Sequence, residues 1–438
     1  MKRILILLAV NTFLIPVLLS QTRAENEENF KEGQYFFIRK DYEDALVYFL
    51  KLIAADPDNA NFNFKVGECY LNIPGKEPMG IPYFEKSLSR LVAKKEYNAK
   101  SIDERSAPLH AYYYLGNAYR IDNQLNKALE CYQKFIDSPF FYGNYNQDIV
   151  DQEIKSCERA KIIQDAPLDM EWVNLGEHIN TEFSEQKPVI SGDGNTLVFI
   201  RKLQFYDAIF CSVKAGGKWQ QAVNINPQIL SDGEFYPSGL SNDGSHLLLI
   251  KYENHNADIY HSELKDGTWT KAEILQGKIN SSKLEVHASF GPDEKSIFFS
   301  SDRTGSKGGL DIFVSELNQN GDWEKPKNLG KIINTKFDEQ VAYRLQEPNV
   351  LFFSSKGHYN MGGYDIFYAE KKGKNWSIPV NIGYPLSDTR DNLYYSPVIT
   401  DVREGIISYE KEGGFGSTDI YLVRIKSGNT LNFSSDKE

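Results

Sequence analysis

The sequence predicts a two-domain protein of the α plus all-β class, an N-terminal α-solenoid followed by a five-bladed β-propeller. The first observation is that the hydrophobic period changes from about 3.6 to about 2 near residue 166. The second is a strand of the form Asp-Ile-aromatic that recurs about every 51 to 54 residues, a spacing typical of propeller blades. The third is that the tryptophans keep a common register with these strands: Trp172, Trp219, Trp269, Trp323 and Trp376.

Length and composition agree with two domains and argue against a nucleic-acid partner. The chain has 438 residues, more than one hydrophobic core usually organises. Its net charge of -11 at pH 7 does not suggest the basic face that neutralises phosphates. Aromatic residues make up 13% of the chain and concentrate on the expected propeller strands, where they suit a half-buried pleated surface.

Residues 1–24 are typical of an export signal. The start is positively charged, residues 4–19 are apolar, and Ala24 offers a cleavage site, with Ser20 as the alternative. The apolar stretch contains polar residues and is short for a membrane-spanning helix. We therefore expect an exported, periplasmic protein with no direct membrane span.

Between residues 25 and 165 the sequence predicts three helical repeats and a final capping helix. The landmarks have the spacing of tetratricopeptide (TPR) helix pairs, in which small residues let helices approach and aromatic residues fill the gap. They are Gly33, Phe36, Ala45, Phe49 and Pro57; Gly67, Tyr70 and Phe84; and Tyr112, Leu115, Gly116, Tyr119, Ala128 and Tyr132. We expect a helix from Tyr42 to Ala55 that Pro57 stops, because proline has no N–H to donate. The capping helix is expected over residues 149–163.

Residues 166–171 are expected to form a short linker, 172–426 the propeller and 427–438 a tail. The Asp-Ile-type strands begin at Asp207, Asp258, Asp311, Asp365 and Asp419, whose carboxylates should accept hydrogen bonds from a nearby turn. Trp172 has no such strand before it, and Asp419 has no tryptophan after it. We therefore expect the Trp172 strand to complete the last blade, since closing the ring protects the sheet edges.

The repeat resembles that of a known family. Its landmarks are Ser-x-Asp-Gly-x-x-Leu-x-Phe and then Ser-Ser-Asp-Arg-x-Gly followed by Gly-x-Asp-Ile-Phe, as at residues 300–313. They resemble the WD-like repeat of TolB and of periplasmic proteins with an OmpA-type peptidoglycan-binding domain, over roughly Asp169 to Lys426. The resemblance implies a place beside the outer membrane and, in one group of relatives, type IX secretion. This sequence ends without an OmpA-type domain, so direct peptidoglycan binding is not expected.

No pattern in the sequence indicates a catalytic residue, a cofactor or a metal site. The seven histidines are scattered, and none has the spacing of a metal motif. Cys69, Cys131, Cys157 and Cys211 are expected as small buried hydrophobes, with a Cys69–Cys131 or a Cys131–Cys157 disulfide left open.

Three carboxylates stand near the start of the innermost strands. Glu185, Glu285 and Glu339 occupy this place in three repeats and could face the central channel. A glycosidase would use a pair of carboxylates there as acid and base. Repetition at equivalent positions favours a structural role, because a catalytic acid and base are placed individually.

We expect a non-enzymatic scaffold that binds protein partners of the cell envelope through its helical groove and its propeller face. The candidate contact residues are Tyr35, Tyr70, Tyr112 and Tyr119 in the groove and Glu185, Glu285 and Glu339 at the channel. The alternative is a propeller that binds or hydrolyses carbohydrate at its mouth. A third hypothesis keeps the scaffold but assigns its partner to surface nutrient uptake or a cell-wall complex.

Overall fold

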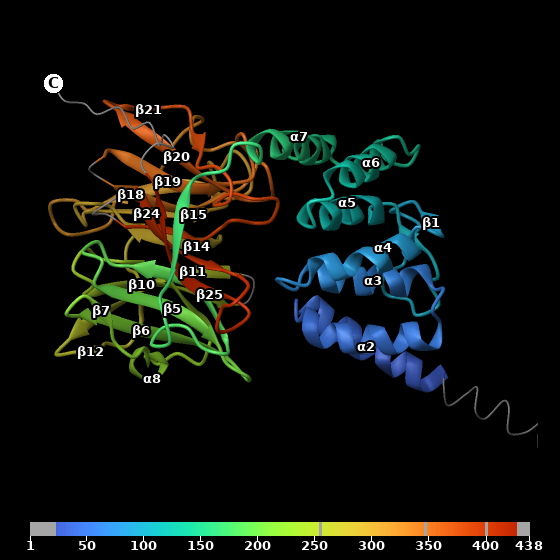
Figure 1. Cartoon of the computed structure of the whole chain (residues 1–438), viewed down its shortest axis with the longest axis horizontal. Coiled ribbons are helices and arrows are strands. Elements are labelled where there is room, and N and C mark those ends of the chain that lie inside the picture. Colours follow the sequence, from blue (N-terminus) through green and yellow to red (C-terminus); the bar gives the residue numbers. More distant parts are fainter. Residues whose placement is uncertain (1–22, 254–255, 346–347, 399–401, 427–438) are drawn as a thin grey trace, which may run out of the picture. The chain divides into compact units, whose positions relative to one another are not determined.

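The computed structural model describes residues 23–253, 256–345, 348–398 and 402–426. The chain divides into two compact units between Glu158 and Arg159, inside helix α7 (Gln147–Ile163) and ahead of the linker expected at 166–171. Figure 1 shows one helical unit and one propeller. The expected export signal lies outside the described residues except for positions 23 and 24, which begin a helix over 23–38. The expected tail, 427–438, also lies outside them.

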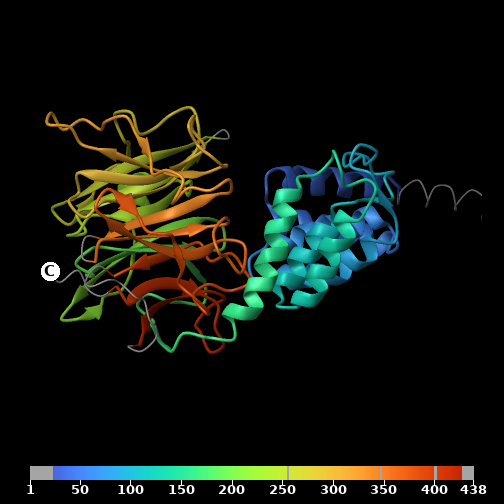
Figure 2. The same ribbon diagram turned by 90° about the horizontal axis from the view of Figure 1, so that it is seen from above.

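The helical unit is a stack of short helices. After the first helix it contains α2 (Tyr42–Ala55), α3 (Ala60–Leu71), the 3-10 helix η1 (Glu77–Gly80), α4 (Ile81–Ser87), α5 (Ala111–Ile121), α6 (Leu125–Ile136) and α7. From α2 to α6, each helix packs on its neighbour in sequence (Figures 1 and 2). A parallel pair of short strands, β1 (Leu91–Val92) and β2 (Ala107–Pro108), lies between α4 and α5 and was not predicted from the sequence.

Local signals set the ends of these helices. The Asp41 carboxylate accepts a hydrogen bond from the N–H of Asp44 at the start of α2. The helix ends at Ala55, and Pro57 follows two positions later, as predicted. Helix α7 begins at Gln147 rather than at residue 149.

Three glycines bring paired helices close together. The same contact occurs three times: Gly33 with Phe49, Gly67 with Phe84 and Gly116 with Tyr132. A Cβ atom on Gly67 would lie 2.8 Å from the ring of Phe84, closer than real Cβ contacts come. All three rings are fully buried, so each fills the space that the glycine leaves. The predicted packing, in which small residues let paired helices approach and aromatic residues fill the gap, is confirmed for these three pairs.

The second unit is a five-bladed propeller, as predicted. Blade 1 contains β4 (Ser184–Ile190), β5 (Thr196–Lys202), β6 (Asp207–Ala215), β7 (Lys218–Trp219) and β8 (Val223–Asn224). Blade 2 contains β9 (Phe235–Leu240), β10 (His246–Glu253), β11 (Asn256–Lys265), β12 (Thr268–Trp269) and β13 (Glu273–Ile274), and the one-turn helix α8 (Asn226–Ile229) precedes it. Blade 3 contains β14 (Glu285–Phe290), β15 (Ser296–Ser301), β16 (Asp311–Glu316) and β17 (Lys327–Asn328).

The remaining two blades follow the same plan. Blade 4 contains β18 (Glu339–Leu345), β19 (Val350–Ser355), β20 (Asp365–Lys372), β21 (Asn375–Trp376) and β22 (Val380–Asn381). Blade 5 contains β23 (Tyr395–Pro397), β24 (Glu404–Tyr409), β25 (Asp419–Ile425) and β3 (Met170–Asn174). Blades 1, 2 and 4 contain five strands each, because their outer strand is split in two. In blade 1 the chain leaves the ladder between β7 and β8, where Ala222 packs into the core.

The inner strands surround a central axis. Each contacts the next in the order β4, β9, β14, β18, β23 and back to β4. Strand β3 pairs antiparallel with β25 and sets Trp172 opposite Val423. Blade 5 therefore combines strands from both ends of the propeller sequence. The stretch expected as a linker also joins this unit, because the N–H of Leu168 donates to the carbonyl oxygen of Tyr384 at 2.7 Å.

The hydrophobic core lies between successive blades. Strand β10 is apolar and buried at four consecutive positions, 247–250. Leu247 and Leu249 pack in the cluster shared with blade 1, whereas Leu248 and Ile250 pack in the cluster shared with blade 3. Both faces of a blade are thus covered, which explains why its middle strands do not alternate between apolar and polar residues.

Carboxylates at the start of the Asp-Ile strands hold the turn before them. The side chain of Asp311 accepts hydrogen bonds from the N–H of Lys307 at 2.9 Å and from the side-chain amide of Asn328 at 2.7 Å. Asp365 and Asp419 make the same pair of contacts with a preceding turn and an outer-strand asparagine. The predicted structural role is confirmed for these three residues.

Candidate functional site

The three repeated glutamates do not face the channel. Glu185, Glu285 and Glu339 are fully buried at the start of β4, β14 and β18. Each accepts hydrogen bonds from the N–H and the hydroxyl of a residue four positions earlier, namely Thr181, Ser281 and Thr335. The expectation of a channel-facing carboxylate is therefore wrong, because each side chain turns back onto the loop before its own strand.

Two of these glutamates form buried ion pairs. The Nε atom of Arg201 lies 2.7 Å from Oε1 of Glu185, and Nη2 of Arg303 lies 2.7 Å from Oε1 of Glu285. Burial raises the pKa of Glu185, while the hydrogen bonds from Thr181 and Arg201 act in the opposite direction. These buried carboxylates hold the loop before each inner strand against an arginine of the same blade, and they are not placed to exchange protons with a substrate.

Glu339 has a different environment. The hydroxyl of Ser355 donates to Glu339 at 2.8 Å, and no arginine of the described chain forms an ion pair with it. Burial raises the pKa of Glu339 to about 8, since the hydrogen bonds from Thr335 and Ser355 offset only part of the desolvation.

The four candidate tyrosines have different surroundings. Tyr70 is buried and stacks on Tyr83, with 5.6 Å between ring centres. Tyr119 is buried and its hydroxyl donates to Glu85. Packing accounts for both, so they are not available to a partner. Tyr35 is 50% exposed.

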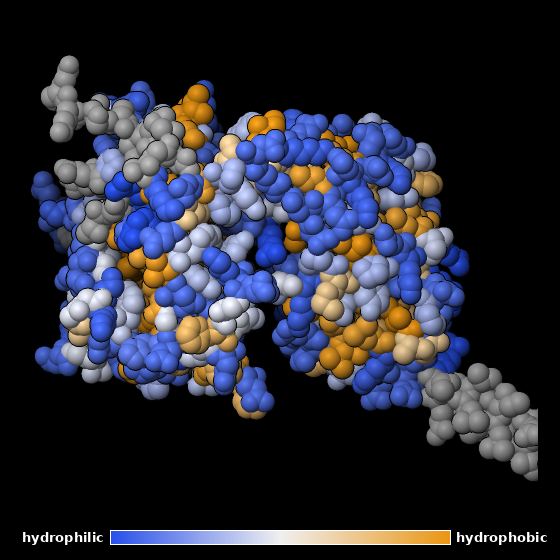
Figure 3. Space-filling model, viewed as in Figure 1, coloured by the Kyte–Doolittle hydropathy of each residue, from blue (hydrophilic) through white to orange (hydrophobic). Residues whose placement is uncertain are grey.

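Tyr112 lines a groove in the helical unit. The groove has a volume of about 370 Å³, walls formed by Leu91, Val92, Leu109, Tyr112 and Phe140, and a polar rim of Lys134, Asp137 and Ser138. Phe140 is 50% exposed although its ring is apolar. Hydrophobic patches are visible on the surface of the helical unit in Figure 3. Of the four predicted tyrosines, Tyr112 is thus the one that lines this groove.

A second group of side chains, which we name the axial cluster, comes from the inner strands. Its members are Lys187 on β4, Tyr236 on β9, His287 on β14, Tyr343 on β18 and Tyr394 immediately before β23. The Nζ atom of Lys187 lies 3.8 Å from the ring centre of Tyr236 and 5.5 Å from that of Tyr394. The rings of His287 and Tyr343 meet edge to face, 5.4 Å apart. Sequence reasoning missed all five residues.

Burial shifts the pKa values of the two bases in this cluster. It lowers the pKa of Lys187 to about 8. It lowers the pKa of His287 to about 3, with a smaller contribution from the positive charge of Lys187. His287 is therefore neutral at pH 7, whereas most Lys187 side chains carry a charge.

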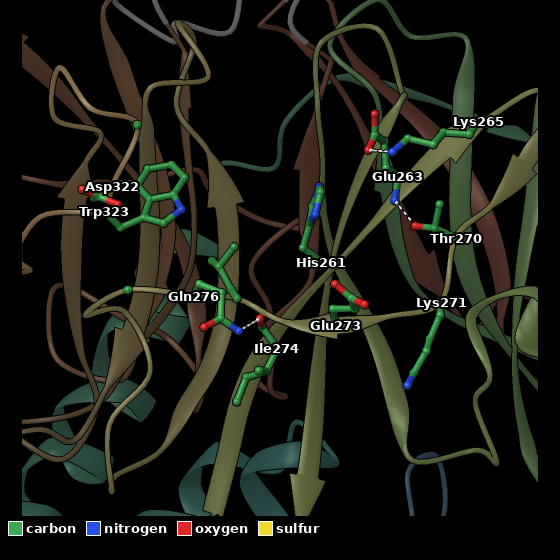
Figure 4. Close-up of a pocket in the computed structure, with 13 residues that line it drawn as sticks. His261, Glu263, Lys265, Thr270, Lys271, Glu273, Ile274, Gln276, Asp322 and Trp323 are labelled. Carbon is green, nitrogen blue, oxygen red and sulfur yellow. Dashed lines mark hydrogen bonds and ion pairs between the residues drawn. The ribbon is translucent and has the colours of Figure 1, made fainter.

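A surface cleft of about 490 Å³ lies at the outer edges of blades 2 and 3. Figure 4 shows Trp323 and Asp322 on one side and His261, Glu263 and Glu273 on the other. Glu263 forms an exposed ion pair with Lys265 at 2.8 Å. The cleft combines one aromatic wall with polar groups opposite.

Neither a metal site nor a membrane span is found in the part of the chain that the structure describes. No three His, Cys, Asp or Glu side chains gather there as ligands, and no helix there is long and apolar enough to cross a bilayer. Cys69, Cys131, Cys157 and Cys211 are free thiols, so neither disulfide that the sequence left open is formed.

Among known proteins, the chain matches solved structures only. No protein-family model and no curated protein matches the chain. A TolB from Agrobacterium tumefaciens is 17% identical with a TM-score of 0.36, and the match covers 57% of this chain and 78% of that one. TolB from Acinetobacter baumannii is 16% identical with a TM-score of 0.36, covering 64% and 73%. An α-L-arabinofuranosidase from Podospora anserina is 13% identical with a TM-score of 0.36, covering 59% and 98%. We derive neither an activity nor a partner from these likenesses.

Proposed function

We propose that the protein is a non-enzymatic scaffold of the cell envelope that binds an extended peptide segment of a partner protein in its helical unit. In this proposal the helical unit is a TPR-like array, and β3 closes the propeller as a rigid second platform. The proposal includes export to the periplasm by the signal expected at residues 1–24. The resemblance of the repeat to envelope proteins supports a place beside the outer membrane, in envelope biogenesis or secretion of the type IX kind. Protein binding is the part of this proposal that the geometry supports best.

The observation that carries it is the groove around Tyr112. Its walls are apolar and aromatic, while charged and polar side chains stand at the rim, the arrangement found where proteins bind one another. The exposed ring of Phe140 would lose contact with water when a partner covers it.

Strand β1 favours an extended occupant over a helical one. The N–H groups of Ala107 and Leu109 on the β2 side donate to the carbonyl oxygens of Arg90 and Val92. Backbone groups of successive residues point to opposite edges of a strand, so those of Leu91 point away from β2. Leu91 also lines the groove. A peptide strand added at this edge would gain backbone hydrogen bonds and bury alternate side chains in the groove.

Selection from a random peptide library on the whole protein tests the proposal. We expect binders with apolar residues at every second position, because alternate side chains of a strand share one face. Fluorescence anisotropy on the selected peptide should show that Tyr112→Ala weakens binding at least tenfold. Tyr35→Ala is the matched control, since Tyr35 is exposed and lies outside the groove residues.

Two results would overturn the assignment. One is a selected peptide whose affinity is the same for the wild type and for Tyr112→Ala. The other is an equal loss in Tyr35→Ala and Tyr112→Ala, which would point to a general effect on folding. Circular dichroism of both variants shows whether the helices are intact.

Carbohydrate binding is the second candidate, and the cleft beside Trp323 favours it. A half-buried aromatic wall facing polar side chains offers stacking and hydrogen bonding to a sugar. Hydrolysis at Glu285 is not part of this candidate, since that carboxylate is buried and paired with Arg303. Binding on a glycan array that Trp323→Ala abolishes would support it, and an array without signal would reject it.

A further inference from the structure

The axial cluster places a positive charge in the middle of the propeller without a matching carboxylate. Within the described chain, no Asp or Glu forms an ion pair with Lys187. Its ammonium group instead lies over the rings of Tyr236 and Tyr394. Asp207 and Lys202 act on it through space with opposite signs. Because the inner strands contact one another around the ring, this charge sits beside the central channel.

His287 supplies an independent observation. Its side chain is 3% exposed, and neither ring nitrogen has a hydrogen-bond partner. Buried polar groups of folded proteins almost always have such a partner, so an unpartnered pair of nitrogens is a sign of a missing ligand or water. The ring of His287 packs against Tyr343, whose hydroxyl reaches the Ser238 carbonyl oxygen on β9, and Lys187 lies over Tyr236 on the same strand.

We propose that the central channel binds a small oxyanion, a carboxylate or a phosphate, between the ammonium group of Lys187 and the imidazole of His287. The anion would provide the counter-charge that Lys187 lacks, and one of its oxygens would accept a hydrogen bond from the single ring N–H of neutral His287. The rings of Tyr236 and Tyr394 lie beside the ammonium group, and a tyrosine hydroxyl is a hydrogen-bond donor. A cation would not suit the site, because Lys187 already occupies the aromatic surface.

The far end of the channel limits the size of the ligand. A small cavity of about 30 Å³ is lined there by Tyr343, Ser289 and Ser396, near the ends of the inner strands. The hydroxyl of Tyr343 donates to the carbonyl oxygen of Ser238 at 3.3 Å and so ties β18 to β9 across the axis. Little open space remains where the inner strands end, so the proposed ligand is a small molecule placed toward their beginning, beside Lys187.

Isothermal titration calorimetry on the whole protein tests the site, with inorganic phosphate and succinate as separate probes at pH 7. We expect one probe to bind at a single site, and the preferred probe decides between phosphate and carboxylate. Lys187→Met should weaken binding at least tenfold, and Lys187→Arg should retain most of it. Lys214→Met is the matched control, because the ammonium of Lys214 lies 4.6 Å from the ring centre of Trp219 but on the outer edge of blade 1.

The proposal is overturned if neither probe binds, or if Lys187→Met binds as the wild type does. It is also overturned if Lys214→Met loses as much affinity as Lys187→Met. The charge-conserving arginine variant separates loss of the site from loss of the fold, since binding that returns with the charge cannot be a folding effect. Failure of this site would leave the peptide groove untouched, because the two lie in different units.

Discussion

Glutamine substitutions at Glu185 and Glu339 distinguish a buried ion pair from a buried carboxyl group that lacks one. Both side chains are fully buried and accept hydrogen bonds from a threonine four residues earlier. Glu185 also pairs with Arg201, whose side chain is 7% exposed. Glu185→Gln leaves that guanidinium inside the blade without a counter-charge.

The two costs can be worked from the contacts. Removing one partner of a buried pair costs about 3–5 kcal/mol. Arg201 keeps a hydrogen bond to the carbonyl oxygen of Ile179 at 2.7 Å and a place over the ring of Phe210, so we expect about 3 kcal/mol for Glu185→Gln. At pH 7 the raised pKa of Glu339 keeps most of its carboxyl protonated. Glu339→Gln then replaces one neutral group by another and should cost about 1 kcal/mol, roughly one hydrogen bond.

Urea unfolding followed by tryptophan fluorescence at pH 7 measures this difference. All five tryptophans lie between residues 172 and 376, so the signal reports on the propeller alone. We expect the free energy of unfolding to fall by about 2 kcal/mol more in Glu185→Gln than in Glu339→Gln, the difference between the two costs above. Equal losses in the two variants would refute the reasoning, because they would show that the arginine does not depend on its carboxylate.

Three further predictions concern pH, helix packing and thiol reactivity. The folded pKa of Glu339, about 8, exceeds its ordinary 4.5, so its contribution to stability is complete below pH 4.5 and is lost as the pH rises to about 8. Unfolding midpoints of the wild type should fall through this window more steeply than those of Glu339→Gln, and parallel curves would contradict this. Gly116→Ala pushes a methyl group into the buried ring of Tyr132 and should lower helical-unit stability by about 1–3 kcal/mol; an unchanged melting curve at 222 nm would show that the helices can separate. Burial raises the pKa of the Cys131 and Cys211 thiols to about 11, so iodoacetamide should label them slowly in the native protein at pH 8 and fully in urea without reductant. Mass spectrometry measures the labelling of the native and of the urea-unfolded protein. Thiols that stay unlabelled in urea would indicate a disulfide.

The sequence predicted the repeat but not which side chains face the axis, because a bulge within the inner strand changes the direction of its side chains. The pairing of the inner strand shifts register between Gln186 and Val189 in blade 1, and between Glu285 and His287 in blade 3. Lys187 has a positive φ of 50° at the first of these bulges. An extra residue reverses the in-and-out alternation of a strand. Regular alternation would put Lys187 on the same side of the strand as Glu185, and His287 on the same side as Glu285, but the extra residue at each bulge separates them.

The sequence repeats Ile-Asn at 179–180, 225–226, 279–280 and 333–334, but the repeat does not show what each asparagine contacts. Asn226, Asn280 and Asn334 each accept the N–H of the isoleucine in the preceding Asp-Ile strand, at 2.8 Å. Asn180 does the same for Ile420, from the other end of the propeller sequence. The sequence shows the spacing of these asparagines, but it does not show which backbone N–H each of them binds.

In the helical unit, too, the repeat could be predicted from the sequence, whereas the groove could not. Glycines and aromatic residues that recur in phase predicted the helix pairs and their packing. The groove around Tyr112 depends on Leu91 and Val92, which belong to a segment between repeats that follows no period. A binding surface built on such a segment cannot be read from repeat landmarks.

Pairing between β3 and β25 is the feature on which the ring, the channel and its cluster all depend, and a disulfide tests it directly. Residues 171 and 424 stand opposite each other, where Cα atoms of antiparallel strands lie roughly 4.5–5.5 Å apart and a disulfide fits. Glu404 is the control, because it lies on β24, two strands from β3 and beyond disulfide reach.

Mild oxidation followed by peptide mass spectrometry reads out the bond. We predict an intramolecular disulfide in the Glu171→Cys, Arg424→Cys double variant and none in Glu171→Cys, Glu404→Cys. No bond between residues 171 and 424, or a bond only between two molecules, would contradict a propeller whose two chain ends share one sheet.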